Sequence, residues 1–433
     1  MLKNDLTWTV SLPNTKIFIP DFWQVQTMTE QNLFKIGAKI IERLEENNYE
    51  GYFVGGAVRD YTLGRAVSDV DITTNALPDE IEALFDKTID VGKEHGTIIV
   101  LMDGLPFEVT TYRVEGTYTD HRRPDNVFFT QHLKEDLSRR DFTINAMAMT
   151  ADMDLYDPYN GLKDLKSRLI NTVGTASERF DEDALRMLRA VRFMSQLNFK
   201  LTSETEKAVA EHAGMLRYIA VERITAELRK LYRGINVQSA KDVIAKTDML
   251  SYLPFFQSID KEQYIQSRAL SLEQEAVVHI YRDSALQKHL GTLKLANRQK
   301  TVIKESLKAI EALENGMNTK LLAYRYEEDI LIGVNDIIKL NALVSADLEV
   351  HLEAAIDARP QLALKNRSEL AADGNTLMTA LNAKGGPWLR ECLNAIEEEV
   401  LLGNLINNEK EIVNWVNLHV KNEDGNIVFN DGR

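Results

Sequence analysis

The sequence is poor in cysteine, and it carries no excess of positive charge. Among 433 residues the single cysteine is Cys392, so an internal disulfide framework is excluded and a reducing compartment, the cytoplasm, is expected. The formal net charge is −15. Proteins that coat nucleic acid by electrostatics alone neutralise phosphates with Lys and Arg, so this balance argues against that class but is compatible with a local basic groove.

Long apolar runs are also absent. No stretch has the length and apolarity of a membrane span, and no basic segment followed by an apolar run suggests a secretory signal. We therefore expect neither a membrane partner nor export. The hydrophobic content of 44% is sufficient for packed cores, and the length suits about three domains.

A glycine pair between a strand and a helix is the first informative pattern. Residues 52–54 form a short β-type run, and Gly55-Gly56 lets a ligand approach the backbone without obstruction by Cβ atoms. A helix is expected to start at Ala57 and to end before Gly64. The N-terminus of such a helix is a ready anion site.

Two aspartates follow this turn. Asp69 and Asp71 are two residues apart, so on a strand both carboxylates point to one face and can hold one or two divalent cations. Val70 and Ile72 then face the core. A glycine turn or an Asp-x-Asp pair is common by itself. The two together with Arg59 supply the groups needed to transfer a nucleotidyl group from a metal-bound triphosphate.

The segments GGAVRD at residues 55–60 and DVD at residues 69–71 resemble the signature of the polymerase β superfamily of nucleotidyltransferases. The resemblance is to the bacterial class II CCA-adding tRNA nucleotidyltransferases and poly(A) polymerases, and it continues to about residue 234. It implies two Mg²⁺ ions at Asp69 and Asp71, CTP and ATP as substrates, and the tRNA 3′ end as acceptor. The alternatives are a poly(A)-, CC- or A-adding enzyme of the same family, and a non-enzymatic RNA-binding homologue.

A third acid is expected on a neighbouring strand. The β-type runs at residues 97–102 and 106–112 are joined by Asp103-Gly104, a strong hairpin signal. Glu108 alternates with Phe107 and Val109, which places its carboxylate opposite the core. Folds of this superfamily often use such an acid, so Glu108 is a candidate catalytic residue; a surface or structural role is the alternative.

Residues 113–124 have loop composition and a basic tip. They resemble the family's flexible loop, which implies a mobile lever between cytosine and adenine addition; an ordinary solvated surface is the other interpretation. The loop residues concerned are Asp120, His121, Arg122 and Arg123.

The segment SRRDFTINA at residues 138–146 resembles the family's second motif. An arginine at a helix start can grip triphosphate oxygens bidentately, and the resemblance assigns this contact to Arg140. Asn145 can either hydrogen-bond a sugar hydroxyl or brace the turn.

A helix near residues 182–192 carries arginines at every third position: Arg186, Arg189 and Arg192. A salt-bridged face with nearby acids (Glu178, Asp181 and Glu182) is one interpretation. The other is base recognition by Asp183 and Arg186. Cytosine and adenine both present an amino donor beside a ring-nitrogen acceptor, whereas uracil and guanine present the reverse pattern, so a carboxylate paired with an arginine accepts the first pair and rejects the second.

This helix resembles the family's Glu-Asp-x-x-Arg motif, with Glu182 at its first acid. Mapped by motif, the family's nucleotide contacts fall on Gly56, Arg59, Arg140, Asp183, Arg186, Arg189 and Arg192.

The expected fold class is α+β, with a nucleotidyltransferase head of small mixed sheet and helices followed by all-helical domains. Thr29 is expected to cap the first helix. The expected divisions are an unassigned extension (1–27), a catalytic head (28–165), a base-recognition neck (166–235), a body (236–335) and a tRNA-binding tail (336–433).

Overall fold

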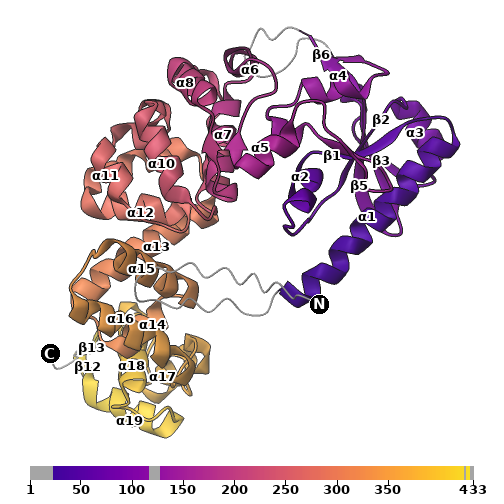
Figure 1. The fold of residues 1–433 in the computed structure, drawn as a ribbon. Helices are drawn as coiled ribbons and strands as arrows, with labels where there is room; N and C mark the ends of the chain where they lie inside the picture. Colours follow the sequence, from indigo (N-terminus) through magenta and orange to yellow (C-terminus); the bar gives the residue numbers. More distant parts are fainter. Residues whose placement is uncertain (1–22, 117–126, 424–425, 430–433) are drawn as a thin grey trace, which may run out of the picture. The chain divides into compact units, whose positions relative to one another are not determined.

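The computed structural model describes residues 23–116, 127–423 and 426–429, which divide into two compact units (Figure 1). The first unit runs to Met194 and also contains Asn198–Tyr218. The second contains Ser195–Leu197 and the chain from Ile219 onward. The first combines a mixed sheet with helices and the second is mainly helical, which confirms the α+β class. The division into head, neck, body and tail stays a prediction.

A seven-stranded mixed sheet forms the centre of the first unit. Strands β2 and β5 run parallel, and the other neighbours in the sheet are antiparallel. The expected hairpin between β4 and β5 is confirmed: Asp103 and Gly104 both have positive φ, 51° and 82°, as a tight turn that matches the strand twist requires. In sheet order the strands are β3 (Thr88–Gly92), β4 (Thr97–Met102), β5 (Leu105–Thr111), β2 (Asp71–Thr74), β1 (Gly51–Val54), β8 (Ala148–Met149) and β9 (Leu155–Tyr156).

Helix α1 (Trp23–Glu46) packs against β1, β2 and β4 (Figure 1). It buries Ile40, Ile41 and Leu44 completely, since these positions recur at helical spacing. The helix begins at Trp23, so the prediction that Thr29 caps its N-terminus is wrong. No glycine or proline stands between residues 23 and 28 to end the helix there.

Short helices and two small strand pairs complete the first unit. The expected helix after Gly55-Gly56 is confirmed, because α2 is followed by Gly64 at φ 64°. The neck is not wholly helical as expected, since β10 (Leu169–Ile170) pairs in parallel with β11 (Lys200–Leu201); β6 (Arg113–Glu115) pairs with β7 (Val127–Phe129). The remaining helices are α2 (Gly56–Thr62), α3 (Pro78–Leu84), α4 (Leu133–Ser138), α5 (Gly161–Ser167), α6 (Ala176–Glu182), α7 (Leu185–Leu197) and α8 (Ser203–His212).

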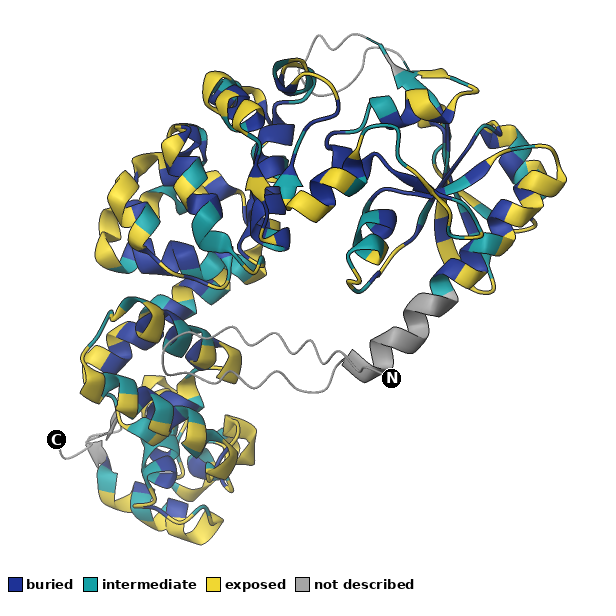
Figure 2. Cartoon of the chain, viewed as in Figure 1, coloured by how far each residue is buried: buried dark blue, intermediate teal, exposed yellow. Residues whose placement is uncertain are grey.

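The second unit is a succession of helices whose buried residues lie on their inner faces (Figure 2). One expectation fails here, because the tail also contains an antiparallel pair, β12 (Val420–Glu423) with β13 (Asn426–Phe429). The helices are α9 (Val221–Leu231), α10 (Val237–Lys246), α11 (Lys261–Gln266), α12 (Leu272–Arg282), α13 (Asn297–Glu314), α14 (Thr319–Arg325), α15 (Glu328–Asn341), α16 (Ala346–Ala358), α17 (Gly374–Ala380), α18 (Pro387–Leu402) and α19 (Glu409–His419).

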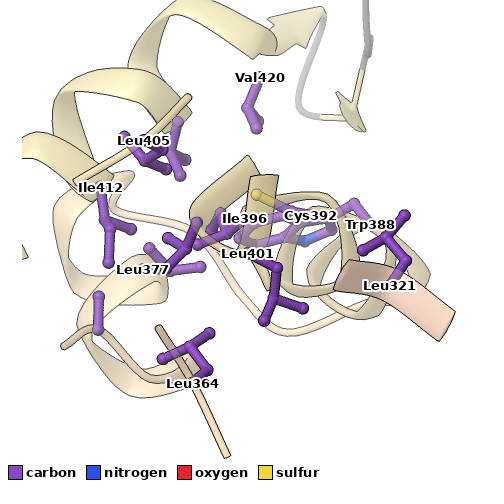
Figure 3. Close-up of a cluster of buried hydrophobic side chains, with 13 residues drawn as sticks. Leu321, Leu364, Leu377, Trp388, Cys392, Ile396, Leu401, Leu405, Ile412 and Val420 are labelled. Atoms are coloured by element: carbon purple, nitrogen blue, oxygen red, sulfur yellow. The ribbon is translucent and has the colours of Figure 1, made fainter. Parts of the chain in front are cut away.

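An apolar cluster stabilises the end of the second unit (Figure 3). Trp388, Cys392 and Ile396 of α18 contribute to it, and Leu377 and Ile412 reach it from α17 and α19. Burial raises the pKa of the Cys392 thiol to about 12, so the only cysteine is a core side chain and not a reactive group. None of the helices in the described ranges has the length and apolarity to cross a membrane.

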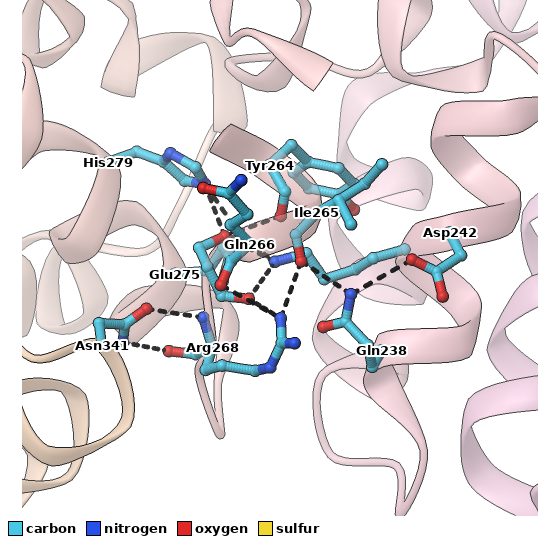
Figure 4. Close-up of polar contacts among 11 residues, drawn as sticks. Gln238, Asp242, Tyr264, Ile265, Gln266, Arg268, Glu275, His279 and Asn341 are labelled. Atoms are coloured by element: carbon cyan, nitrogen blue, oxygen red, sulfur yellow. Dashed lines mark hydrogen bonds and ion pairs between the residues drawn. The ribbon is translucent and has the colours of Figure 1, made fainter. Parts of the chain in front are cut away.

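A buried polar network joins α10 to α12 within the second unit (Figure 4). Lys241 Nζ donates to Glu275 Oε1 at 2.6 Å and to Ser267 Oγ at 2.6 Å. His279 Nε2 lies 3.0 Å from the same Glu275 oxygen. Burial opposes ionisation of Glu275, but Lys241 and His279 outweigh it and lower its pKa to about 2. The charges therefore compensate one another inside the core.

Replacing Lys241 by methionine tests how much this network contributes to the stability of the fold. The variant leaves the Glu275 carboxylate buried without its main counter-charge, and we expect the free energy of unfolding to fall by about 3–5 kcal/mol. Urea unfolding measures the change. The matched control is Lys261→Met, which removes an exposed pair with Asp248 at 2.8 Å and should cost at most about 1 kcal/mol. Equal stability of the two variants would contradict the assignment.

Candidate functional site

Carboxylates from two neighbouring strands gather at one place in the first unit. Ile72 on β2 stands opposite Val109 on β5, and both are fully buried. Asp71 and Glu108 each precede this pair by one residue, so both lie on the other face of the sheet. The alternation that predicted an outward Glu108 is therefore confirmed.

Asp69 approaches the same place from outside the sheet. Strand β2 begins only at Asp71, so the expectation that both aspartates stand on one strand is wrong, although Val70 is buried as predicted. The Asp69 carboxylate is exposed and accepts a hydrogen bond from Ser68 Oγ at 2.7 Å. The strand therefore does not fix the direction of the Asp69 side chain, although Asp69 is only two residues from Asp71.

The neighbouring acids affect the ionisation of Asp71. Burial raises the pKa of Asp71 to about 6, the negative charges of Glu108 and Asp69 add to this rise, and Arg140 opposes it. In the described part of the chain, no group of three or more His, Cys, Asp or Glu side chains is placed so that it could hold a metal ion. The three acids nevertheless supply the oxygen donors that hard divalent cations prefer, and a cation between them would remove their mutual repulsion.

Gly55 brings the backbone next to this cluster. Its φ of 74° lies in the region that favours glycine. A Cβ atom at this position would lie 3.2 Å from Arg140 Nη1 and 3.8 Å from Asp71 Oδ2. The Gly55 backbone therefore lies close to both the Asp71 carboxylate and the Arg140 guanidinium.

Arg140 is held by a buried acid that the sequence analysis did not assign. Asp136 is fully buried and accepts from Arg139 at 2.8 Å and from Arg140 at 3.4 Å. Burial opposes ionisation of Asp136, but both arginines outweigh it and lower its pKa. The spacing of three and four residues from the arginines was an available signal. Arg140 also follows the end of α4 at Ser138 and does not open a helix as expected, because the chain is extended at Phe142, which bridges to Thr172.

Asn145 and Asp141 connect the glycine turn with α7. Asn145 Oδ1 accepts from Arg59 Nη1 at 2.7 Å, and Asn145 Nδ2 donates to Asp141 Oδ1 at 3.1 Å. Both ends of the Asn145 amide are used within the protein, which favours the bracing interpretation. Arg59 also donates to both carboxylate oxygens of Asp60, at 3.0 and 2.7 Å.

Asp141 is the counter-charge of Arg189. Its Oδ2 accepts from Arg189 Nε at 2.7 Å, and the ion pair closes at 2.6 Å through Nη2. Burial opposes ionisation of Asp141, but Arg189, Asn145 and Arg186 outweigh it and lower its pKa to about 2. This pair spans 48 residues, and no local spacing could have revealed it.

The start of α7 positions the expected base-reading pair. Arg186 Nη1 donates to Glu182 Oε2 at 2.5 Å, and Nη2 donates to the Arg139 carbonyl at 3.2 Å. Asp183 Oδ1 accepts from the Leu185 N–H at 3.1 Å. Glu182 thus neutralises Arg186, as the salt-bridge interpretation expects. Asp183 lies two residues before the first residue of α7.

The remaining predicted site residues fall in two groups. Arg192 is buried on α7, and its guanidinium carbon lies 4.0 Å from the centre of the Phe193 ring. The flexible-loop residues lie outside the described residues: Asp120, His121, Arg122 and Arg123.

Models of known protein families match this chain. The Poly A polymerase head domain matches residues 51–171, and the tRNA nucleotidyltransferase domain 2 matches residues 275–416. The first match contains the glycine turn and the acid cluster.

Relatives of full length are also found. The chain is 42% identical over 400 residues to a CCA-adding enzyme of Staphylococcus aureus (strain MSSA476), with 90% of this chain and 100% of the relative covered. It is similar to the crystal structure of the Bacillus stearothermophilus CCA-adding enzyme in complex with CTP, with a TM-score of 0.78, 34% identity, and coverage of 89% of this chain and 97% of that chain. A Thermotoga maritima CCA-adding enzyme complexed with tRNA shares the fold, with a TM-score of 0.61 at 21% identity, covering 89% of this chain and 94% of that chain.

The site geometry and the full-length similarity agree. The chain belongs to the CCA-adding enzyme family, a family of metal-dependent nucleotidyltransferases.

Proposed function

We propose that this protein adds C, C and A in turn to the 3′ end of tRNA, from CTP and ATP, with release of pyrophosphate and without a nucleic-acid template. It would act in the cytoplasm. The observation that carries the proposal is the meeting of Asp71 and Arg140 at Gly55, because a metal ligand and a phosphate-binding cation then flank one glycine turn. The identity of 42% along the whole of a CCA-adding enzyme supports it.

The acid cluster is the proposed metal site. Asp69 and Asp71 would hold two Mg²⁺ ions, with Glu108 as the third carboxylate. Bound there, the ions would lower the pKa of the tRNA 3′ hydroxyl and neutralise the departing pyrophosphate. Asp71 is half-buried on β2, which restricts its carboxylate, while the exposed Asp69 and Glu108 can adjust to the substrate.

The cationic side of the site would receive the triphosphate and the sugar. The Gly56 backbone and Arg59 lie at the start of α2, and Arg140 reaches the same turn. Arg189 and Arg192 approach from α7. Because carboxylates, an amide or an aromatic ring already hold these guanidinium groups, the protein has oriented them before the nucleotide arrives, which is the condition for effective charge stabilisation.

Base selection is proposed for Asp183 and Arg186. Arg186 has five N–H donors in a fixed fork, and its bonds to Glu182 and to the Arg139 carbonyl orient that fork. The Leu185 N–H fixes the Asp183 carboxylate in the same way. An acceptor and a donor held side by side would match the amino group and ring nitrogen of cytosine or adenine, whereas uracil and guanine would set acceptor against acceptor.

The activity is tested with tRNA that ends just before CCA. The protein is incubated with each nucleoside triphosphate separately and then with CTP and ATP together, and product length is read on a sequencing gel. We expect two additions from CTP and a third after ATP is supplied. A long adenosine tail, a stop after CC, addition of A alone, or no extension would contradict the proposal.

Asp71→Asn tests the metal assignment. The amide keeps the size of the side chain but removes a charge from the cation site, and a metal contribution of several kcal/mol makes the expected loss of transfer at least about 100-fold. Initial rates at saturating Mg²⁺ measure this loss. Asp154→Asn changes an exposed carboxylate of the same unit outside the site and should keep full activity. Near-normal activity of Asp71→Asn would overturn the assignment.

Asp183→Ala tests base selection. Loss of the acceptor for the amino group should reduce the preference of kcat/KM for CTP over UTP by a factor equivalent to about 1–3 kcal/mol. The control is Asp181→Ala, which removes an exposed acid two residues earlier that lies 3.4 Å from His212. If Asp183→Ala discriminates against UTP as well as the control does, another pair reads the base.

A further inference from the structure

One aromatic ring lies beneath three of the proposed nucleotide-binding arginines. The side chain of Phe193 on α7 is only 4% exposed. The guanidinium carbons of Arg192, Arg59 and Arg189 lie 4.0, 5.1 and 5.7 Å from its ring centre. All three distances are within the range of a favourable cation–π contact, about 6 Å. Two of the arginines come from α7 itself, and Arg59 comes from α2.

The ring of Phe193 offsets electrostatic repulsion among these arginines. Three guanidinium groups that converge on one place repel one another, and like charges are costly where water is excluded. The carboxylates described above, Asp60 and Asp141, bind Arg59 and Arg189 from their sides. The face of an aromatic ring carries partial negative charge, so Phe193 attracts the three cations from a common centre without forming a salt bridge that a phosphate would have to break.

The ring is itself fixed in orientation. Phe142 packs edge-on against it, with ring centres 5.7 Å apart and planes at 83°. Phe142 precedes the short helix of Asn145, the residue that accepts from Arg59. The aromatic pair and the amide therefore hold α2 and α7 in one arrangement.

We propose that Phe193 is a positioning residue for the nucleotide, whose ring face holds Arg59, Arg189 and Arg192 in one array for the triphosphate and sugar. The proposal rests on the proposed function, because it assigns the array to nucleotide binding. Phe193 contacts no reacting atom and acts through the arginines. Its aromatic face, and not only its bulk, is the property that matters.

Fluorination of the ring separates these two properties. Replacing Phe193 by difluoro- and then trifluorophenylalanine withdraws the negative charge from the ring face with little change in shape. We expect KM for CTP and ATP to rise stepwise, from roughly threefold to roughly tenfold, while kcat at saturating nucleotide changes less than about twofold because the acid cluster is intact. Phe193→Leu should raise KM further, since it also changes the packing.

Phe199 is the matched control. It is 5% exposed, it lies six positions further along the chain, and among the described residues no guanidinium lies over its ring. The same fluorinated residues at position 199 should leave KM unchanged. Thermal unfolding of every variant confirms an intact fold.

Failure of the positioning role and failure of the proposed function give different results. If the unmodified protein extends tRNA but KM is flat across the Phe193 series, or rises equally in the Phe199 series, the positioning role is wrong while the proposed function stands. If the fluorinated Phe193 proteins lose kcat and keep KM, the ring serves the chemical step and the inference is overturned. Absence of extension by the unmodified protein would instead remove the proposed function on which the inference rests.

Discussion

A buried carboxylate, Asp141, is the constraint on which the nucleotide side of the site depends. A carboxylate excluded from water is tolerated only when its charge and its hydrogen-bonding oxygens are satisfied. Asp141 meets this requirement with Arg189 and Asn145, and Asn145 in turn accepts from Arg59. One acid therefore fixes arginines on α2 and on α7, so any loss of its charge would loosen both together.

The site has two halves of opposite charge, the acid cluster and the group of arginines. On one side, burial and the like charges of Glu108 and Asp69 raise the pKa of Asp71 and favour a bound cation. On the other side, acids and an aromatic face hold the guanidinium groups in place, which leaves them oriented and still able to attract a polyanion. Gly55 lies where the halves meet. A metal-bound triphosphate has both the cations and the anions that this division requires.

Local patterns in the sequence predicted much of this arrangement. Strand alternation placed Glu108 opposite the core, the Asp103-Gly104 turn predicted the hairpin, and Gly64 marked the end of α2, because each feature depends only on neighbouring residues. The rule that puts Asp69 and Asp71 on one face failed since it presumes a strand, and β2 starts at Asp71.

Long-range partners could not be predicted in this way. The pairing of Asp141 with Arg189 and the position of Arg59 above Phe193 join segments that only the fold brings together. Asp136 is different, because its helical spacing from Arg139 and Arg140 was visible in the sequence. The sequence did not show that Asp136 is buried. Burial turns what would be an ordinary surface pair into a fixed support for Arg140.

The central claim is that protein side chains, arranged before the substrate binds, take the place of a template. Crystal structures of this protein bound to CTP and to ATP test it most directly. The account predicts that the amino group of either base donates to the Asp183 carboxylate, that the ring nitrogen accepts from Arg186, and that the triphosphate lies between the Gly55-Gly56 turn and Arg140. A base held by other side chains, or one that reaches neither Asp183 nor Arg186, would contradict it.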